Sequence, residues 1–249
     1  MLKAQLDKYV EQYETSDFIK NDPIQFPHRF KDRNDIEIAG FLSAMFSFGR
    51  REVFIQKLDE LFERMENKPF EFIKSYNSKN KSLDGFLYRF AKDSDVKEVC
   101  RILNILYSEN KTLEELFSYS YSSTKSVRGM LQGVCDYFYL RANLPMRQGF
   151  CYLLPNPNKN SACKRLNMLL RWFVRDGDVD LGIWKFIDKS ELLIPLDTHV
   201  ARLSREFGLL KRKNDDFQSV IEITEGLKKL DPKDPVKYDF ALFGYGVNN

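Results

Sequence analysis

The stretch SACKRLNMLLRWFVR, residues 161–175, carries the strongest helical pattern in the chain. Its apolar side chains recur at the spacing of one helix face, and Ser161 has the chemistry of an N-cap. A loop is expected before it, because residues 142–160 contain three prolines that one helix cannot hold. The segment therefore predicts a buried helix that starts directly after a long connection.

Outward from this segment, apolar residues recur at helical spacing along most of the chain. Only 12 Gly and 9 Pro occur in 249 residues, which is too few for the turns of a many-stranded sandwich or barrel. Asp35 and Asp197 occupy N-cap positions. The expected fold class is all-α, with further helices from 2 to a stop at 21–23, over 35–48, 51–65, 96–107, from 113, 126–140, 181–187, 198–207, 216–230 and 235–243.

Composition excludes several classes of protein. At 43% hydrophobic residues the chain is a folded globular protein rather than a disordered one. The four cysteines form no C-x-x-C pair and only two histidines occur, so no cofactor or metal centre is expected. The chain has neither an apolar signal core nor an 18-residue uncharged run, and the expectation is a cytoplasmic, soluble monomer with no membrane partner.

Charge is distributed unevenly. Between Lys125 and Arg175 there are nine basic residues and one acidic residue, so this block carries +8 and the rest of the chain carries −5. Aromatic residues are interleaved with these cations, a combination that suits a phosphate backbone with bases stacked nearby. The alternative is that the charges are solvated helix faces above core aromatics.

Two segments resemble the helix-hairpin-helix-GPD superfamily of DNA base-excision glycosylases. They are IPLDTHVARLSREFGLL, residues 194–210, and EIAGFLSAMFSFGRREVFIQKLDELFERM, residues 37–65. Together with LLPNPNKNSACKRLNMLLRWFVR, residues 153–175, and DPVKYDFALFGYGV, residues 234–247, the chain looks more closely like an uncharacterised bacterial family within that superfamily. The closer resemblance covers most of the chain.

The resemblance implies a two-lobed helical bundle of the DNA glycosylase type with a cleft between the lobes. Residues 32–194 would form a central helical barrel lobe with a degenerate hairpin. Residues 1–31 and 195–249 would form the second helical lobe. DNA, as a damaged duplex, would be the partner and would bind across the cleft.

The catalytic residues implied by the resemblance are Lys164 and Asp197. A carboxylate beside C1′ stabilises the positive charge that develops on the sugar as the base leaves. A lysine amine can attack the same carbon and form a Schiff base, after which the strand is cut. Lys164 precedes Asp197 by 33 residues, an interval similar to that of the archaeal 8-oxoguanine glycosylase branch. The alternatives are a helix cap for Asp197 and an exposed lysine for Lys164.

Where most superfamily members hold a phosphate with a Gly-x-Gly hairpin, this chain has PNPNKNSACK, residues 155–164, with no glycine. The iron–sulfur cysteines of the endonuclease III branch are also missing after Asp197. Phe48 is either a wedge in the base stack or a buried helix end, with the buried role favoured. A structural role is favoured for His199 as well. Candidate DNA contacts are Arg50, Arg51, Lys159, Ser161, Arg165 and His199.

The function expected from these residues is DNA repair by base excision. The enzyme would be a glycosylase, possessing AP lyase activity if Lys164 is the nucleophile, with an oxidised purine such as 8-oxoguanine as candidate substrate. Two alternatives remain open. One is a catalytically inactive nucleic-acid-binding protein of the same fold, and the other is a helical protein-interaction module.

Overall fold

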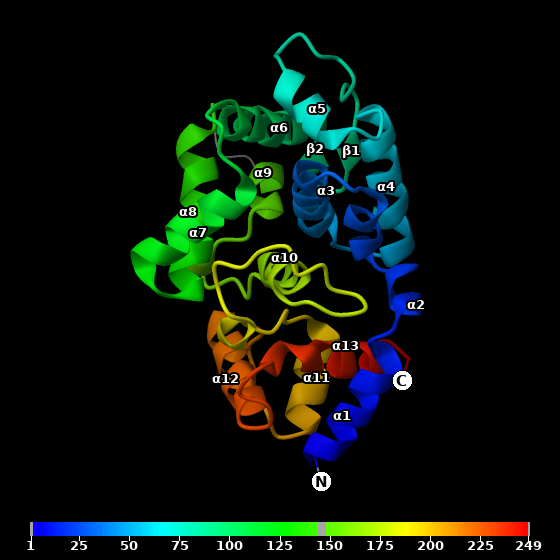
Figure 1. The fold of residues 1–249 in the computed structure, drawn as a ribbon, viewed down its shortest axis with the longest axis vertical. Helices are drawn as coiled ribbons and strands as arrows, with labels where there is room; N and C mark the ends of the chain where they lie inside the picture. Colours follow the sequence, from blue (N-terminus) through cyan, green and yellow to red (C-terminus); the bar gives the residue numbers. More distant parts are fainter. Residues whose placement is uncertain (1, 144–147, 249) are drawn as a thin grey trace. The chain divides into compact units, whose positions relative to one another are not determined.

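The computed structural model describes residues 2–143 and 148–248, most of which are helical, as the periodicity predicts (Figure 1). The chain divides into two compact units. The terminal unit comprises Met1–Ile24 with Pro157–Asn249, and the central unit comprises Gln25–Asn156. Residues 157–194, expected with the central lobe, thus belong to the terminal unit.

The terminal unit is built from helices on both sides of the central unit in the sequence. Its α-helices and short 3₁₀ helices are α1 (Leu2–Tyr13), α2 (Ser16–Ile19), η1 (Pro23–Gln25, at the boundary), η3 (Pro157–Lys159), α10 (Lys164–Val174), η4 (Lys189–Glu191), α11 (Thr198–Glu206), α12 (Phe217–Lys228), η5 (Pro235–Lys237) and α13 (Tyr238–Asn248).

Helices α1 and α13 pack side by side, which joins the two ends of the chain (Figure 1). The rings of Tyr9 and Tyr245 stack with their centres 4.6 Å apart. A Cβ atom at Gly244 would lie 2.4 Å from the ring of Tyr13, so only glycine allows this close approach. Helix α11 packs on α13 as well, and α13 is therefore the helix around which the terminal unit is assembled.

The central unit contains a helical bundle and one small hairpin. Its elements are η2 (Pro27–Arg29), α3 (Arg33–Phe46), α4 (Arg51–Arg64), α5 (Pro69–Ser75), β1 (Leu87–Tyr88), β2 (Ala91–Lys92), α6 (Asp93–Ser108), α7 (Leu113–Thr124), α8 (Val127–Arg141) and α9 (Gln148–Leu153).

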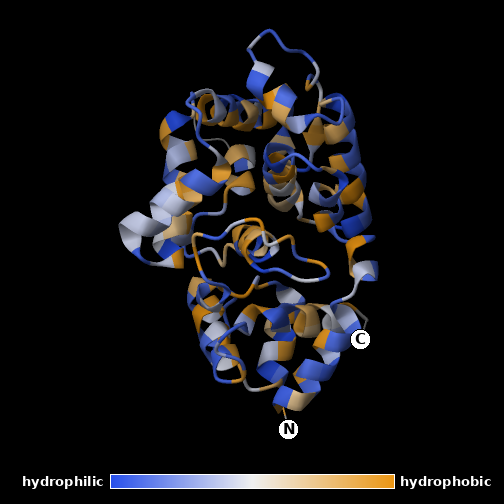
Figure 2. Ribbon diagram, viewed as in Figure 1, coloured by the Kyte–Doolittle hydropathy of each residue, from blue (hydrophilic) through white to orange (hydrophobic). Residues whose placement is uncertain are grey.

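Helix α3 forms the core of the central unit. Residues 37–46 are all buried, as expected for a helix that is apolar on every side. Phe41 stacks on Phe138 of α8, with ring centres 5.4 Å apart. Other helices of this unit show hydrophobic and hydrophilic residues alternating along their length, which is the pattern of helices with one buried face (Figure 2). The capping box from Thr112 to Glu115 at the start of α7 is confirmed.

Two helix starts differ from their predicted positions. The cap of α3 is Asp32, whose Oδ1 accepts from the backbone N–H groups of Asn34 and Asp35, while Asp35 accepts from the N–H of Phe70. Helix α10 begins at Lys164 rather than after Ser161. The Ser161 Oγ accepts from Cys163 N–H at 3.2 Å and therefore closes a local turn instead of capping the helix.

Three further expectations are corrected. The described part of the loop 142–160 contains α9, which forms between two of the prolines; one of these, Pro145, lies outside the described residues. Residues 181–187 are not helical, because the N–H groups of this segment bond to the carbonyls of Trp172 and Phe173 at the end of α10. The hairpin β1–β2 was not expected from the sequence; it pairs Leu87 with Lys92.

A buried ion-pair network, here called the arginine network, fixes α10 within the terminal unit. Arg175 Nη2 donates to Glu14 Oε2 at 3.0 Å, Nη1 donates to Asp180 Oδ2 at 3.0 Å, and Nε donates to Asp234 Oδ2 at 2.9 Å. Arg171 Nε donates to Asp180 Oδ1 at 3.2 Å, and its Nη1 donates to Asp239. Each link joins α10 to a segment distant in sequence or to the turn that follows α10.

The network holds two guanidinium groups and four carboxylates, so acids are in excess. Burial opposes the charge on Arg175, but Glu14, Asp180 and Asp234 outweigh it and raise the pKa of Arg175. Burial also raises the pKa of Asp180, against the lowering effect of Arg171 and Arg175. Both arginines therefore stay charged, and any proton taken up near neutral pH goes to a carboxylate.

Replacing Arg175 by methionine is expected to lower the free energy of unfolding by about 3–5 kcal/mol, since two buried carboxylates and one half-buried carboxylate lose a cation. Denaturant unfolding measures the loss. The control is Lys3→Met, which removes an exposed i,i+4 pair with Asp7 and should cost less than about 1 kcal/mol. Equal effects of the two substitutions would show that the network contributes nothing beyond a surface ion pair.

Candidate active site

Asp197 is the N-cap of α11, as its position predicts. Its Oδ1 accepts from the backbone N–H groups of His199 and Val200, each at 2.9 Å. Both cap bonds end on Oδ1, so Oδ2 takes no part in the cap. The side chain is half-buried, and one carboxylate thus can fix the start of α11 and present a second oxygen at the helix N-terminus.

Lys164 is the first residue of α10 and is half-buried. Its Nζ lies 3.5 Å from Met168 Sδ and 5.8 Å from the ring centre of Phe243 on α13. The amine therefore lies over an aromatic face rather than in an ion pair of the kind found for Arg171 and Arg175. Lys164, Met168 and Arg171 follow one another along one face of α10, and Arg175 is the C-cap residue directly after the helix.

Asp239 is buried on α13 and bonds to Arg171. It lies one turn before Phe243, whose ring centre is 5.8 Å from Lys164 Nζ and 6.4 Å from the ring centre of His199, two residues after Asp197. Burial raises its pKa to about 6; Arg171 and Lys164 lower it, whereas the charge of Asp197 raises it. Lys164 and Asp197 both lie close enough to Asp239 to change its ionisation. An amine and two carboxylates are thus grouped where α10, α11 and α13 meet.

Sequence reasoning missed Asp239, although a signal was present. It is the only charged residue of α13, and its neighbours in the helix are Tyr238, Phe240, Ala241 and Leu242. A single acid within an apolar helix is rarely buried without a partner or a role. Its partner, Arg171, could not be identified from the sequence because it lies 68 residues earlier.

His199 has a structural partner. Its Nδ1 lies 2.8 Å from the carbonyl oxygen of Gly246, and its ring lies edge-on to Phe243 at 6.4 Å. These contacts tie the first turn of α11 to the end of α13. The structural role favoured for His199 is therefore present, and its expected phosphate contact remains a prediction.

The loop before α10 replaces the missing glycines with other residues in left-handed conformations. Asn160 has φ +59° and Cys163 has φ +50°. Asparagine adopts this region more readily than most other residues, so the loop holds two left-handed residues without glycine. Lys159 is exposed in this loop, Ser161 is half-buried, and Arg165 is buried with 9% of its surface exposed.

The early loop lies at the end of α3. Phe48 is 9% exposed and packs against Tyr88 and Tyr152, with ring centres 4.7 and 4.8 Å away. Phe48 is therefore buried at the end of α3, which is the role favoured over a wedge in the base stack. Arg50 is exposed and Arg51 is half-exposed at the start of α4.

The basic block of residues 125–175 is not one surface. Arg171 and Arg175 are buried in the arginine network, and Arg165 is buried too. Lys125, Arg128 and Lys159 are exposed, whereas Arg147 lies outside the described residues. A large part of the +8 charge therefore serves packing inside the terminal unit.

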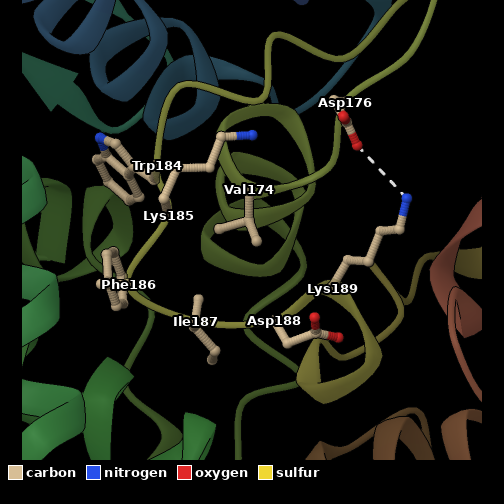
Figure 3. Close-up of a pocket in the computed structure, with 8 residues that line it drawn as sticks. All are labelled: Val174, Asp176, Trp184, Lys185, Phe186, Ile187, Asp188 and Lys189. Atoms are coloured by element: carbon tan, nitrogen blue, oxygen red, sulfur yellow. Dashed lines mark hydrogen bonds and ion pairs between the residues drawn. The ribbon is translucent and has the colours of Figure 1, made fainter.

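A surface pocket of about 320 Å³ in the terminal unit contains neither Lys164 nor Asp197 (Figure 3). Lys189 and Asp176 point toward one another across it, with 3.4 Å between Nζ and Oδ1, and Asp188 accepts from Ser190 N–H to cap η4. Its charged groups thus have structural partners. The lining residues are Val174, Asp176, Trp184, Lys185, Phe186, Ile187, Asp188 and Lys189.

Within residues 2–143 and 148–248, no group of three or more His, Cys, Asp or Glu side chains is arranged to hold a metal ion. None of the helices described there is both long enough and apolar enough to cross a membrane.

The raised pKa of Asp239 makes stability depend on pH. Its carboxyl binds a proton more tightly in the folded protein, at about 6, than at the ordinary value of 3.8, so its contribution to stability is full below pH 4 and declines as pH rises to 6. The free energy of unfolding should be measured for the native chain and for Asp239→Asn at several pH values between 4 and 6. Relative to the variant, the native chain should lose roughly 2–3 kcal/mol of stability as pH rises from 4 to 6. A difference that stays constant with pH would contradict the assignment.

Comparison with known proteins gives a family for nearly the whole chain. No curated protein and no solved structure matches it. Residues 22–248 match the family described as "Protein of unknown function (DUF2400)". The matched region includes all of α3 to α13, and with them Lys164, Asp197 and Asp239. The chain therefore belongs to the DUF2400 family.

Proposed function

We propose that the protein is a DNA base-excision glycosylase with AP lyase activity, of the helix-hairpin-helix-GPD type, acting on an oxidised purine such as 8-oxoguanine. The observation that carries the proposal is the grouping of the Lys164 amine and the Asp197 carboxylate around Asp239. The proposal includes the two-lobed glycosylase fold that the sequence resembles, with DNA as the partner.

Each residue of the group has a chemical role in this reaction. The neutral amine of Lys164 attacks C1′, the N-glycosidic bond breaks, and the base leaves with its electron pair. Asp197 stabilises the positive charge on the sugar through its carboxylate. The attacking nitrogen must lose a proton, and the departing base must gain one. We assign that transfer to Asp197 and Asp239, the carboxylates of this group, whose charges act on one another.

The loop before α10 supports DNA binding by the same segment. Backbone N–H groups at a helix N-terminus bind anions, and α10 starts with Lys164 directly after the turns at Asn160 and Cys163. The absence of hairpin glycines in residues 155–164 is the feature that most favours the catalytically inactive alternative. The left-handed conformations of Asn160 and Cys163 support the active enzyme, because glycine is the residue that most often adopts them.

Trapping with borohydride tests the nucleophile. The protein is incubated with a duplex that carries 8-oxoguanine or an abasic site, and borohydride reduces any Schiff base to a covalent adduct. We expect an adduct with the native chain and none with Lys164→Gln, because glutamine has no nucleophilic amine.

The matched control is Lys229→Gln, which removes an exposed lysine of the same unit that is assigned no role in DNA binding and should still give the adduct. No adduct from either lesion would overturn the lyase proposal, and no base release from a panel of lesions would overturn the glycosylase proposal. Duplex binding without either activity would favour the inactive nucleic-acid-binding alternative, and no salt-dependent binding would favour the protein-interaction module.

Asp197→Asn separates catalysis from capping. Asparagine caps helices about as well as aspartate, so the melting temperature should change little. Loss of the negative charge should lower the single-turnover rate of base release by about 100-fold or more. If Asp197→Asn releases base at the native rate, Asp197 acts as a cap alone. The same conclusion follows if the rate of base release falls only as far as the melting temperature and the folded fraction fall.

A further inference from the structure

Four aromatic rings form a continuous chain from the interior of the central unit to its surface. Ring centres lie 4.7 Å apart between Tyr88 and Phe48, 4.8 Å between Phe48 and Tyr152, and 5.2 Å between Tyr152 and Phe90. Tyr88 and Phe48 are buried, whereas Tyr152 is 40% exposed and Phe90 is 42% exposed. Two buried rings therefore support two rings that reach solvent.

The backbone around the exposed rings is held closely. A Cβ atom at Gly149 on α9 would lie 2.3 Å from the carbonyl oxygen of Phe90, so α9 packs directly on the turn of the hairpin. Tyr88 Oη donates to the carbonyl of Phe48 and joins the hairpin to the loop after α3. The position of Phe90 is thereby fixed before any ligand binds, which lowers the entropic cost of binding.

Cations flank the two exposed rings. Arg50, Arg89 and Lys92 are exposed, and none of them takes part in an ion pair among the described residues. The Arg89 guanidinium lies 5.5 Å from the centre of the Phe90 ring. The same guanidinium packs on Gly49, because a Cβ atom at Gly49 would lie 2.6 Å from Arg89 Nη1. The guanidinium therefore lies between the hairpin and the loop that precedes Arg50.

Two of the acids near these cations, Asp93 and Asp95, have partners of their own, and Glu52 is the exception. Asp95 is buried and accepts from Lys92 N–H at 2.9 Å. Asp93 lies 3.5 Å from Lys97 and accepts from Gly85 N–H. Glu52, in the first turn of the neighbouring helix α4, is exposed. Among the residues named here, the three exposed cations Arg50, Arg89 and Lys92 therefore outnumber the one exposed acid.

We propose that Phe90 and Tyr152 form a platform on which unpaired DNA bases stack, with Arg50 and Arg89 contacting the adjacent phosphates. Exposed aromatic faces beside free guanidinium groups are the combination that binds single-stranded nucleic acid, because every base has a face to stack and every nucleotide a charge to neutralise. The stacking role considered as the alternative for Phe48 passes to Phe90, and the buried ring of Phe48 packs against Tyr152 behind it. The inference rests on the proposed function only in its choice of DNA as partner.

Equilibrium binding of the full chain to an oligothymidine of about 20 nucleotides tests the platform, with fluorescence anisotropy as the readout. Phe90→Ala should weaken binding about fivefold or more, the equivalent of about 1 kcal/mol for one stacked base. Phe90→Trp should retain the native affinity. The matched control is Tyr119→Ala, which removes a ring that is 74% exposed on α7 of the same unit and should have no effect.

The salt dependence tests the cations separately. Each phosphate contact that is lost should reduce the slope of log affinity against log salt concentration by about 0.7 for a single strand. Arg89→Gln and Arg50→Gln should each show this change, while Phe90→Ala should leave the slope as it is. An unchanged slope in both arginine variants would remove the phosphate contacts from the proposal.

Two results would overturn the platform: native affinity in Phe90→Ala, or no binding of oligothymidine by the native chain. Its failure can be distinguished from failure of the glycosylase proposal because oligothymidine binding and the borohydride adduct are separate readouts, the first tested with Phe90→Ala and the second with Lys164→Gln. A borohydride adduct together with unaffected binding in Phe90→Ala would reject the platform alone. Weakened binding in Phe90→Ala without any adduct would reject the glycosylase alone.

Discussion

The terminal unit depends on the burial of two arginines at the C-terminal end of α10. Arg171 and Arg175 are surrounded by Glu14, Asp180, Asp234 and Asp239, and these acids come from four separate places in the chain. Burying two cations is unfavourable unless each is paired and hydrogen-bonded, so the partners must be in place together. The position of Lys164, two turns before Arg171 on the same face of α10, follows from that requirement.

The network and the candidate site share one carboxylate. Asp239 bonds to Arg171, and its pKa responds to both Lys164 and Asp197. A carboxylate in a structural ion pair must stay charged, whereas a carboxylate that transfers protons in catalysis must change its charge. With four acids for two arginines, the network can keep both guanidiniums charged while one acid is protonated. A residue that could serve as a proton store is thereby held in place by groups that never lose their charge.

Periodicity and capping chemistry were sufficient for most helices, and Asp197 was placed correctly because an N-cap is a local property of four or five residues. Capping chemistry and periodicity gave wrong predictions where contacts with distant segments decide whether, or where, a helix begins. Ser161 has cap chemistry, but the turn at Cys163 moves the helix start. Residues 181–187 have an apolar pattern, yet they bond to the end of α10. The links of the arginine network to Asp239, Asp234 and Glu14 could not be predicted, because these partners lie 59 to 161 residues from their arginines.

The pairing of α1 with α13 has a consequence for how the chain folds during synthesis. The central unit is one continuous segment, Gln25–Asn156, and all of its partners are available once that segment has left the ribosome. The terminal unit consists of two segments separated by the central unit. Until α13 emerges, Arg171 lacks Asp239 and α1 lacks the helix it packs against. The terminal unit is therefore expected to form second, with α1 exposed to chaperones throughout the interval.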